Sequence, residues 1–465
     1  MMKFAAPFCA LVLAACTTVG PDYRAPGPGE LPVPESYHGR APETAPGELA
    51  RWWERFDDPL LTRLVEEAGA ANLDLAVAAA RLTQAREALV QAQAGRVPTV
   101  GASGGARRGV GDGDDRTSLD LGADIAWEVD LFGRIARGIE AARADAEGAF
   151  YDREALRVAI AAEVATNYVE ARLAQERLAL ARDSLAIADD NLQIARWRVQ
   201  AGLVSSLDAE QARAQRAQTA ASIPALESGF ASAAYRLAVL TGRAPGALTD
   251  ALAPPRPIPE GPESVAVGIP ADTLRQRPDL RAAERTLAGQ TARIGVAEAQ
   301  LYPGLRLGGN IGTAAFSIGG LLDAITGAIF AGIDQTLFDG GRLRSQLRSQ
   351  EAATEAALAS YRQTVLTALE EVENALLALD AARERQAQFA IAQEAASNTA
   401  LLARIQYRAG LTDFRTLLDA ERSLLSARDG LANARGDETL ALVRLYRALG
   451  GGWDPLAAPV TGNRS

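Results

Sequence analysis

The sequence is poor in the side chains that perform most enzyme chemistry. Its 465 residues include two cysteines, Cys9 and Cys16, one histidine, His38, and one lysine, Lys3. A P-loop or a Schiff base needs a lysine, and a Ser-His-Asp triad needs a histidine in a structured site, whereas His38 lies in a Pro/Gly-rich segment. We therefore expect no such enzyme, no cofactor and no metal site. Carboxylates remain as possible catalysts, but no pattern pairs them.

Long hydrophobic runs and a basic charge balance are also missing. No stretch reaches the roughly 18 apolar residues of a membrane-spanning helix, so we predict none. The net charge of -10 argues against nucleic-acid binding, which needs a basic surface. A chain of this length, 48% hydrophobic, can form several domains.

The first residues have the pattern of a bacterial lipoprotein signal peptide. Lys3 precedes an apolar stretch, and Leu13-Ala14-Ala15-Cys16 resembles a lipobox. We predict that residues 1–15 are removed and that Cys16 carries lipid, which leaves no thiol for a disulfide. Thr17, in place of the aspartate associated with inner-membrane retention, indicates the outer membrane. The alternative is an ordinary secretory signal with a chance cysteine.

An internal repeat organises the rest of the chain. Three glycines recur 208 positions later (410 − 202): Gly133, Gly202 and Gly242 match Gly341, Gly410 and Gly450. Residues 72–75 likewise parallel 277–280, at a spacing of 205 (277 − 72). We predict a first repeat at 59–250 and a second at 270–450, joined by a Pro-rich linker at 251–269. An extended segment, 16–58, precedes them, and a tail, 451–465, follows.

Each repeat has the same expected order of elements. A helix at 59–95 or 270–301 is followed by two strands, a long helix, a glycine turn and a return helix. The long helix of the first copy, 135–200, contains no proline and would span about 100 Å at 1.5 Å per residue. Apolar residues recur in it every seven positions, from Val164 to Val199, which is typical of a coiled coil.

One strand has strict alternation. Between Leu119 and Leu131 the odd positions are apolar, and the even positions include Asp120, Asp124, Glu128 and Asp130. About 13 residues at 3.3 Å each can cross an outer membrane when the strand is tilted. We predict that the four acids face a water-filled lumen; an amphipathic sheet on a soluble core is the alternative. Residues 99–107, 305–312 and 329–337 are the other expected strands.

Four strands per chain cannot close a barrel alone, and lipid does not tolerate an open edge. Three chains would supply twelve strands, enough for a wet lumen. The expected fold class is therefore mixed α and β: a homotrimeric outer-membrane β-barrel, four strands per chain, continued by a long periplasmic α-helical coiled-coil barrel, with two internal repeats.

Several motifs resemble the TolC/OprM-like outer-membrane factors, specifically their lipoprotein (NodT-type) branch. The matching segments are 19–26 (VGPDYRAP), 52–59 (WWERFDDP), 127–134 (WEVDLFGR), 277–280 (RPDL), 338–342 (FDGGR) and 418–422 (LDAER). The resemblance implies a homotrimeric exit duct of a tripartite efflux pump in the cell outer membrane. It also implies two partners, a periplasmic adaptor (membrane fusion) protein and an inner-membrane transporter of the resistance-nodulation-division type.

The resemblance also assigns roles to the helical hairpin ends. Gly202 with Leu203, and Gly410 with Leu411, would form the periplasmic turns that meet the adaptor, since glycine permits the chain reversal. Asp419 and Tyr407 match gate positions of the family.

Two further acids, Asp413 and Asp208, join the expected gate because they lie near the turns. The alternative is that these acids are solvated helix-end residues, favoured there by the helix dipole.

Other functions stay open on the sequence alone. A duct for type I protein secretion or metal efflux has the same pattern, because substrate choice belongs to the transporter. A lipoprotein enzyme would need a carboxylate cleft, and a periplasmic tether would have no use for alternating acidic strands.

Overall fold

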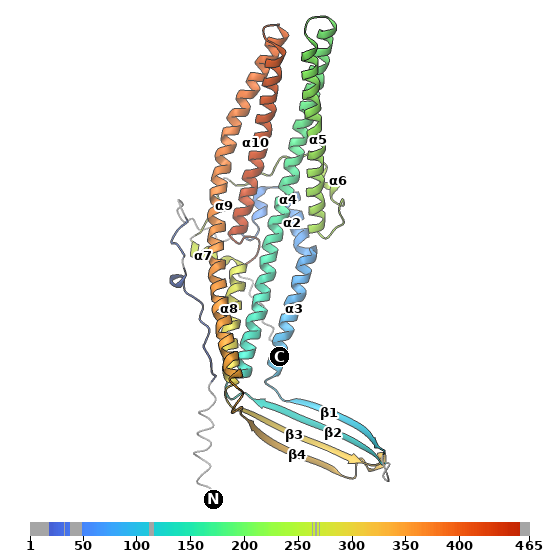
Figure 1. Cartoon of the computed structure of the whole chain (residues 1–465), viewed down its shortest axis with the longest axis vertical. Helices are drawn as coiled ribbons and strands as arrows, with labels where there is room; N and C mark the ends of the chain where they lie inside the picture. Colours follow the sequence, from blue (N-terminus) through green and yellow to red (C-terminus); the bar gives the residue numbers. More distant parts are fainter. Residues whose placement is uncertain are drawn as a thin grey trace.

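The computed structural model describes residues 18–31, 33–37, 49–110, 116–262, 264–265, 267–268 and 270–455. The predicted signal peptide and Cys16 lie outside these described residues. The molecule is a long bundle of helices with one sheet at its end (Figure 1). Within the described residues, no helix is both long and apolar enough to cross a membrane.

Four helices form two hairpins. α4 (Arg134–Gln200) and α5 (Ser206–Leu240) form the first, and α9 (Arg342–Arg408) and α10 (Phe414–Ala448) form the second. α4 and α9 each have 67 residues, and both hairpins end far from the sheet (Figure 1). The predicted long helix at 135–200 is confirmed within one residue.

The remaining elements connect the hairpins to the sheet and to the middle of the molecule. The helices are α2 (Pro59–Ala71), α3 (Leu73–Ala94), α6 (Thr249–Leu252), α7 (Pro270–Gln276) and α8 (Pro278–Ala299). Short 3-10 turns are η1 (Pro28–Glu30), η2 (Trp52–Phe56) and η3 (Ile318–Gly320).

The prediction of unbroken helices at 59–95 and 270–301 was wrong. Asn72 has an extended backbone (φ −65°, ψ 131°), and its side chain caps α3 by accepting hydrogen bonds from the amides of Asp74 and Leu75. Arg277 is also extended, because the following Pro278 disfavours the helical conformation at the residue before it. Each expected helix is therefore two consecutive helices. The second helix of each pair, α3 or α8, begins beside the C-terminal end of a return helix, α5 or α10.

The sheet contains four antiparallel strands in chain order: β1 (Thr99–Gly109), β2 (Arg116–Val129), β3 (Gly304–Ala315) and β4 (Ile325–Asp334). β1 and β2 come from the first copy and β3 and β4 from the second, so the central β2–β3 pairing joins the copies. Within the described residues, the outer edges of β1 and β4 have no partner strand. The strands expected at 99–107, 305–312 and 329–337 are confirmed as β1, β3 and β4, with boundaries shifted by a few residues.

The main core lies midway along the bundle and draws on both copies. Trp52 stacks on Tyr446 of α10 with ring centroids 5.2 Å apart, and Phe56 meets the same ring edge-on. Around them pack buried residues of α2, α4, α5 and α9, among them Leu61 and Val164. Since the hairpins extend beyond this core in one direction and the sheet lies in the other, the core fixes how tips and sheet are aligned.

The N-terminal segment runs along the helices near the sheet. The Arg137 guanidinium of α4 donates to the carbonyls of Val19 and Gly20, both at 3.1 Å, and to the Asp22 carboxylate at 2.7 Å. The Val19 amide donates to the carbonyl of Phe132, just after β2. The first described residues are thus held where the strands join the helices.

Candidate gate and channel surfaces

Both hairpin tips are built on a glycine in the left-handed region. Gly202 has φ +70° and Gly410 has φ +72°, and beyond the two adjacent residues no atom lies within 4 Å of a Cβ built on either glycine. Glycine is therefore required by backbone conformation and not by space. The amide of Leu203 donates to the Arg198 carbonyl and closes the helix end, as in a Schellman motif.

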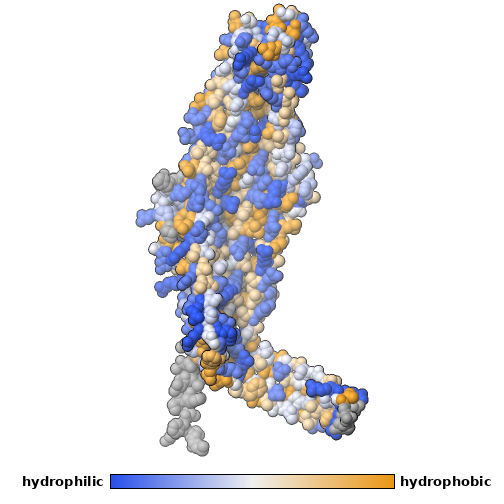
Figure 2. All heavy atoms as spheres, viewed as in Figure 1, coloured by the Kyte–Doolittle hydropathy of each residue, from blue (hydrophilic) through white to orange (hydrophobic). Residues whose placement is uncertain are grey.

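The following leucines are exposed at these tips. Leu203 is 69% exposed and Leu411 79%. Figure 2 shows apolar side chains among the polar ones at this end of the bundle. The tips thus present apolar surface that the chain itself does not cover.

Tyr407 lies inside the second tip. Its ring centroid is 5.5 Å from that of Phe414, and the Arg198 guanidinium of α4 lies 4.6 Å above the ring. The side chain is 6% exposed. Tyr407 therefore connects α9 and α10 of the second hairpin with α4 of the first. Any effect of Tyr407 on the width of a channel acts through this packing.

The three predicted gate acids have different surroundings. Asp413 caps α10, and its carboxylate accepts a hydrogen bond from the Thr416 amide at 2.8 Å. That hydrogen bonding lowers the pKa of Asp413 below its usual value. Asp419, two turns further, faces solvent between Arg415 at 3.9 Å and Arg422 at 3.8 Å.

Asp208 lies in the first turn of α5, on the other hairpin. One chain therefore places Asp413 and Asp419 along one helix and leaves Asp208 apart.

Sequence reasoning missed a partly buried carboxylate beside the predicted gate residues. Glu421 accepts hydrogen bonds from Asn191 of α4 and, at 3.2 Å, from Arg404 of α9. Burial raises the pKa of Glu421 despite these partners. The residue links the two hairpins near their tips. Its position two residues after Asp419 in the LLDAERS segment was the available signal.

On the sheet, Asp120 and Asp124 lie opposite glycines of β1. Asp120 pairs with Gly105 and Asp124 with Gly101, and a Cβ on either glycine would lie under 3.0 Å from the facing carboxylate. The frequent glycines of β1 therefore make room for acids on this face. The other face of β2 carries Leu121 and Ile125, and Figure 2 shows apolar and neutral side chains over the sheet.

The remaining two acids of the predicted strand face lie at the junction with the helices. Glu128 pairs with Arg134 of α4 at 2.8 Å. Placing Asp130 in the strand was wrong, because β2 ends at Val129. Asp130 instead accepts hydrogen bonds from the amides of Ile135 and Ala136, at 3.1 and 2.7 Å, and so satisfies the open start of α4.

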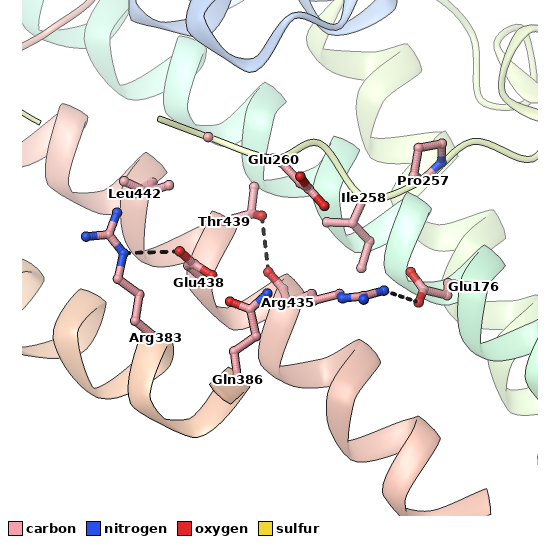
Figure 3. A pocket seen from close by; sticks show the side chains of 11 residues that line it. Glu176, Pro257, Ile258, Glu260, Arg383, Gln386, Arg435, Glu438, Thr439 and Leu442 are labelled. Carbon is pink, nitrogen blue, oxygen red and sulfur yellow. Dashed lines mark hydrogen bonds and ion pairs between the residues drawn. The ribbon is translucent and has the colours of Figure 1, made fainter. Parts of the chain in front are cut away.

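A cavity of about 410 Å³ lies midway along the bundle, between α4, α9, α10 and the linker (Figure 3). Its arginines are paired with acids: Arg383 with Glu438 at 3.1 Å, and Arg435 with Glu176 at 3.7 Å. The Thr439 hydroxyl donates to the linker carbonyl of Pro259 at 2.9 Å. The ion pairs join α9 and α4 to α10, and the Thr439 hydroxyl holds the linker against α10. Among the described residues, no cluster of His, Cys, Asp or Glu could hold a metal ion.

Solved structures define the class of protein. The outer-membrane channel OprN has the same fold with a TM-score of 0.83 and 39% sequence identity; the match covers 94% of this chain and 99% of that chain. The long paired helices and the four-stranded sheet of this chain thus have the fold of an outer-membrane channel.

Sequence comparison identifies the family. The profile of the outer membrane efflux protein family matches residues 64–243 and 269–451, one match for each predicted repeat. Nodulation protein T of Rhizobium leguminosarum bv. trifolii is 32% identical over 466 residues, with 98% of each chain covered. Outer membrane protein OprJ of Pseudomonas aeruginosa is 32% identical over 473 residues, covering 96% of this chain and 95% of OprJ. The chain belongs to the outer membrane efflux protein family and is an outer-membrane component of an efflux system.

Proposed function

We propose that three copies of the chain form the passive exit duct of a tripartite efflux pump. In this proposal the sheets close into one twelve-stranded barrel in the outer membrane, and the hairpins form a helical barrel in the periplasm. An adaptor protein meets the tips, and an inner-membrane transporter of the resistance-nodulation-division type delivers the substrate. The supporting observation is a four-stranded sheet with both outer edges unpaired among the described residues, attached to two 67-residue helices.

The purified protein tests this proposal directly. Its mass in detergent should be that of three chains, and in planar bilayers it should conduct ions without an energy source. Tyr407→Ala should raise the conductance, because it removes packing at the narrow end. A monomer that never conducts, either as wild type or as this variant, would refute the duct.

The lipid anchor is part of the proposal. Cys16 precedes the first described residue, Thr18, by two positions, and Thr18 lies against Gly133 at the junction of sheet and helices. A lipid on Cys16 would then reach the membrane that the strands cross. Mass spectrometry of the mature N-terminus should find a diacylglyceryl, N-acylated Cys16. An unmodified N-terminus, or cleavage elsewhere, would exclude the anchor.

The charge of the lumen follows from the strand faces. Asp120, Asp124 and Glu128 share one face of β2, and threefold symmetry would repeat them as rings of carboxylates that concentrate cations. Reversal potentials in a salt gradient should show cation selectivity, and Asp120→Asn with Asp124→Asn should reduce it. Anion selectivity of the wild type would mean that the faces are assigned the wrong way round.

The gate is proposed at the ring of six tips. Asp413, Asp419 and Asp208 would approach their symmetry copies there, so trivalent cations added on the periplasmic side should block the current. Leu203 and Leu411, beside Gly202 and Gly410, would contact the adaptor. Asp413→Ala with Asp419→Ala should relieve the block while the trimer remains. A double variant that is blocked as tightly as wild type would place the gate elsewhere.

A further inference from the structure

One face of the sheet carries a single large apolar side chain among its described strands. The strand pairings put Asp124 and Glu128 on this face, here called the acidic face, and Phe330 of β4 lies on it as well. Its other residues are glycine, alanine, or polar and charged residues. The large apolar residues of β4, such as Ile329, lie on the opposite face. Contact with lipid therefore does not account for Phe330.

The ring of Phe330 reaches across the neighbouring strand. Phe330 pairs with Gly308 of β3, and a Cβ on this glycine would lie 2.4 Å from the Cζ of the ring. Gly308 is buried, whereas Phe330 is 58% exposed. A larger residue at position 308 would push the ring away from the sheet. The ring of Phe330 with Gly308 beneath it is here called the aromatic shelf.

Charged side chains of opposite sign lie on either side of the aromatic shelf. Arg306 is two residues from Gly308 along β3, in the same row as Glu128. Asp124 lies in the row on the other side of the shelf, opposite Asn310. Successive rows on one face of a sheet are about 6.7 Å apart. A cation, an aromatic ring and an acid therefore follow one another over about 13 Å.

The guanidinium of Arg306 can accept a further anionic partner. Its ion pair with Asp334 of β4 spans 3.6 Å, which is longer than a hydrogen bond, and both side chains are 71% exposed. Glu128, opposite Arg306, is already paired with Arg134 of α4 at 2.8 Å. A carboxylate ligand can therefore form two parallel hydrogen bonds with Arg306.

A cavity of about 840 Å³ gives a ligand room beside the shelf. Its lining includes Phe330, Gly308 and Arg306 from the sheet, with Gln91 of α3 and Gly138 of α4. It lies where the strands meet the helical bundle (Figure 1). Cavities of this size hold small organic molecules.

We propose that the aromatic shelf binds amphoteric aromatic molecules as they pass through the duct. The ring of the ligand stacks on Phe330, its anionic group pairs with Arg306, and its cationic group approaches Asp124. The inference rests on the proposed function and adds to it, because a passive duct needs no contact with its cargo. Stacking on one aromatic ring strengthens binding only about fivefold, so the ligand is released again and transport continues.

Block of the current in planar bilayers tests the shelf with four probes. The first, para-(aminomethyl)benzoate, has an aromatic ring and both charges. Its saturated analogue, trans-aminomethylcyclohexanecarboxylate, has both charges without the aromatic ring. The other two are para-toluate, which lacks the cation, and benzylamine, which lacks the anion.

We expect para-(aminomethyl)benzoate to reduce the current at a concentration at least about fivefold lower than any of the other three probes. Equal potency of the saturated analogue would overturn the stacking contact. Equal potency of benzylamine would overturn the contact with Arg306, and equal potency of para-toluate the contact with Asp124.

Substitutions assign the stacking contact to Phe330. Phe330→Leu keeps an apolar side chain without an aromatic face and should weaken the block by para-(aminomethyl)benzoate about fivefold, whereas Phe330→Tyr should retain it. Ile329→Leu is the matched control, because Ile329 is the adjacent residue on the opposite face. A Phe330→Leu channel blocked at the wild-type concentration would overturn the shelf. Loss of the trimer mass in this variant would also overturn it, since the ring would then serve contact between chains.

The two charged ends have their own variants. Arg306→Gln should remove the advantage of para-(aminomethyl)benzoate over benzylamine, and Asp124→Asn its advantage over para-toluate. Unchanged ratios would overturn the assignment of the ends. A wild-type channel that conducts but is blocked equally by all four probes would overturn the site and leave the duct standing. A wild-type protein that never conducts would instead refute the proposed function.

Discussion

The two copies of the repeat have matching backbones but different side chains at the hairpin tips and at the helix junctions. α3 and α8 both have 22 residues, and α5 and α10 both have 35. At the first tip Ser205 caps the return helix; at the second, Asp413 has the equivalent position. Val199 of the first tip corresponds to the buried Tyr407 of the second. The common backbone requires a glycine and a cap at each tip, whereas the second tip has a charged cap and a buried aromatic ring where the first has a serine and a valine.

The helix junctions show the same division. The Asn72 side-chain amide donates to the Leu240 carbonyl at the end of α5, at 3.0 Å. The Arg277 guanidinium donates to the Ala448 carbonyl at the equivalent end of α10, at 2.8 Å. A neutral amide serves the first copy and a buried cation the second. The lesson is that one backbone requirement, a donor for a carbonyl at the end of a return helix, has two chemical solutions with different energetic consequences.

Removing the second tip's aromatic packing should have the largest effect. Tyr407→Ala deletes a buried ring and should destabilise the tip by about 3–4 kcal/mol, against about 1 kcal/mol for the half-buried equivalent Val199→Ala. Hydrogen exchange of the two tips, with single-channel conductance, measures both effects. If the two substitutions loosen their tips equally, the tips do not differ in packing.

Removing the side chain at the Arg277 junction should cost more stability than removing the one at the Asn72 junction. Arg277→Met leaves the Ala448 carbonyl and the carboxylates of Asp279 and Glu371 without their partner, and should cost about 2–3 kcal/mol because both acids keep some water. Asn72→Ala should cost about 1 kcal/mol.

The readout for the junctions is the thermal unfolding midpoint in detergent. Arg277→Lys is the control: an ammonium cannot reproduce the guanidinium geometry and should rescue little. Full rescue by lysine would show that charge alone matters at this junction.

Substitutions at the two helix caps, Ser205 and Asp413, should have smaller effects, and they separate the capping role of Asp413 from its charge. Ser205→Ala should cost about 1 kcal/mol at the first tip. Asp413→Ser keeps a cap and removes the charge, so it should preserve the helix start yet weaken trivalent-cation block. Because hydrogen bonding lowers the folded-state pKa of Asp413, its stabilisation is present above the ordinary pKa of aspartate and is lost as pH falls through the lowered value. The serine variant should lack this loss in a pH series of tip hydrogen exchange.

The smallest expected effect concerns Glu421, the partly buried acid that joins the hairpins. Burial raises the folded-state pKa of Glu421, so the folded chain binds a proton more tightly than the unfolded chain does. Stability should therefore rise as pH falls through that raised pKa and reach its full gain below the ordinary value of glutamate.

Glu421→Gln should remove this dependence while shifting stability at pH 7 by less than about 1 kcal/mol. Denaturant midpoints at neutral and mildly acidic pH compare the two proteins. A wild type that loses tip stability over this range, in step with the variant, would contradict the assignment.

Much of the fold could be predicted because its signals are periodic. Heptads predicted α4, alternation predicted β2, and a spacing of 208 predicted the second copy. The break at Arg277 was missed although Pro278 signals it in the sequence. The break at Asn72 has no such signal, and its side chain meets the end of α5 only in the folded chain. Asp130 was assigned to the strand because the alternation continues past the residue where hydrogen bonding stops.

The sequence by itself determined the repeat, because matching residues recur at a fixed spacing. It also determined the glycine turns and the apolar and acidic faces, because these depend on neighbours a few positions apart. Only the tertiary structure decided that Tyr407 is buried under Arg198, that Glu421 joins two hairpins, and that α4 is covered while α9 is open. Those facts depend on contacts between segments some 200 residues apart, such as Asn191 with Glu421. Burial, and with it the pKa of a carboxylate or the cost of losing a ring, is set by what the folded chain brings together.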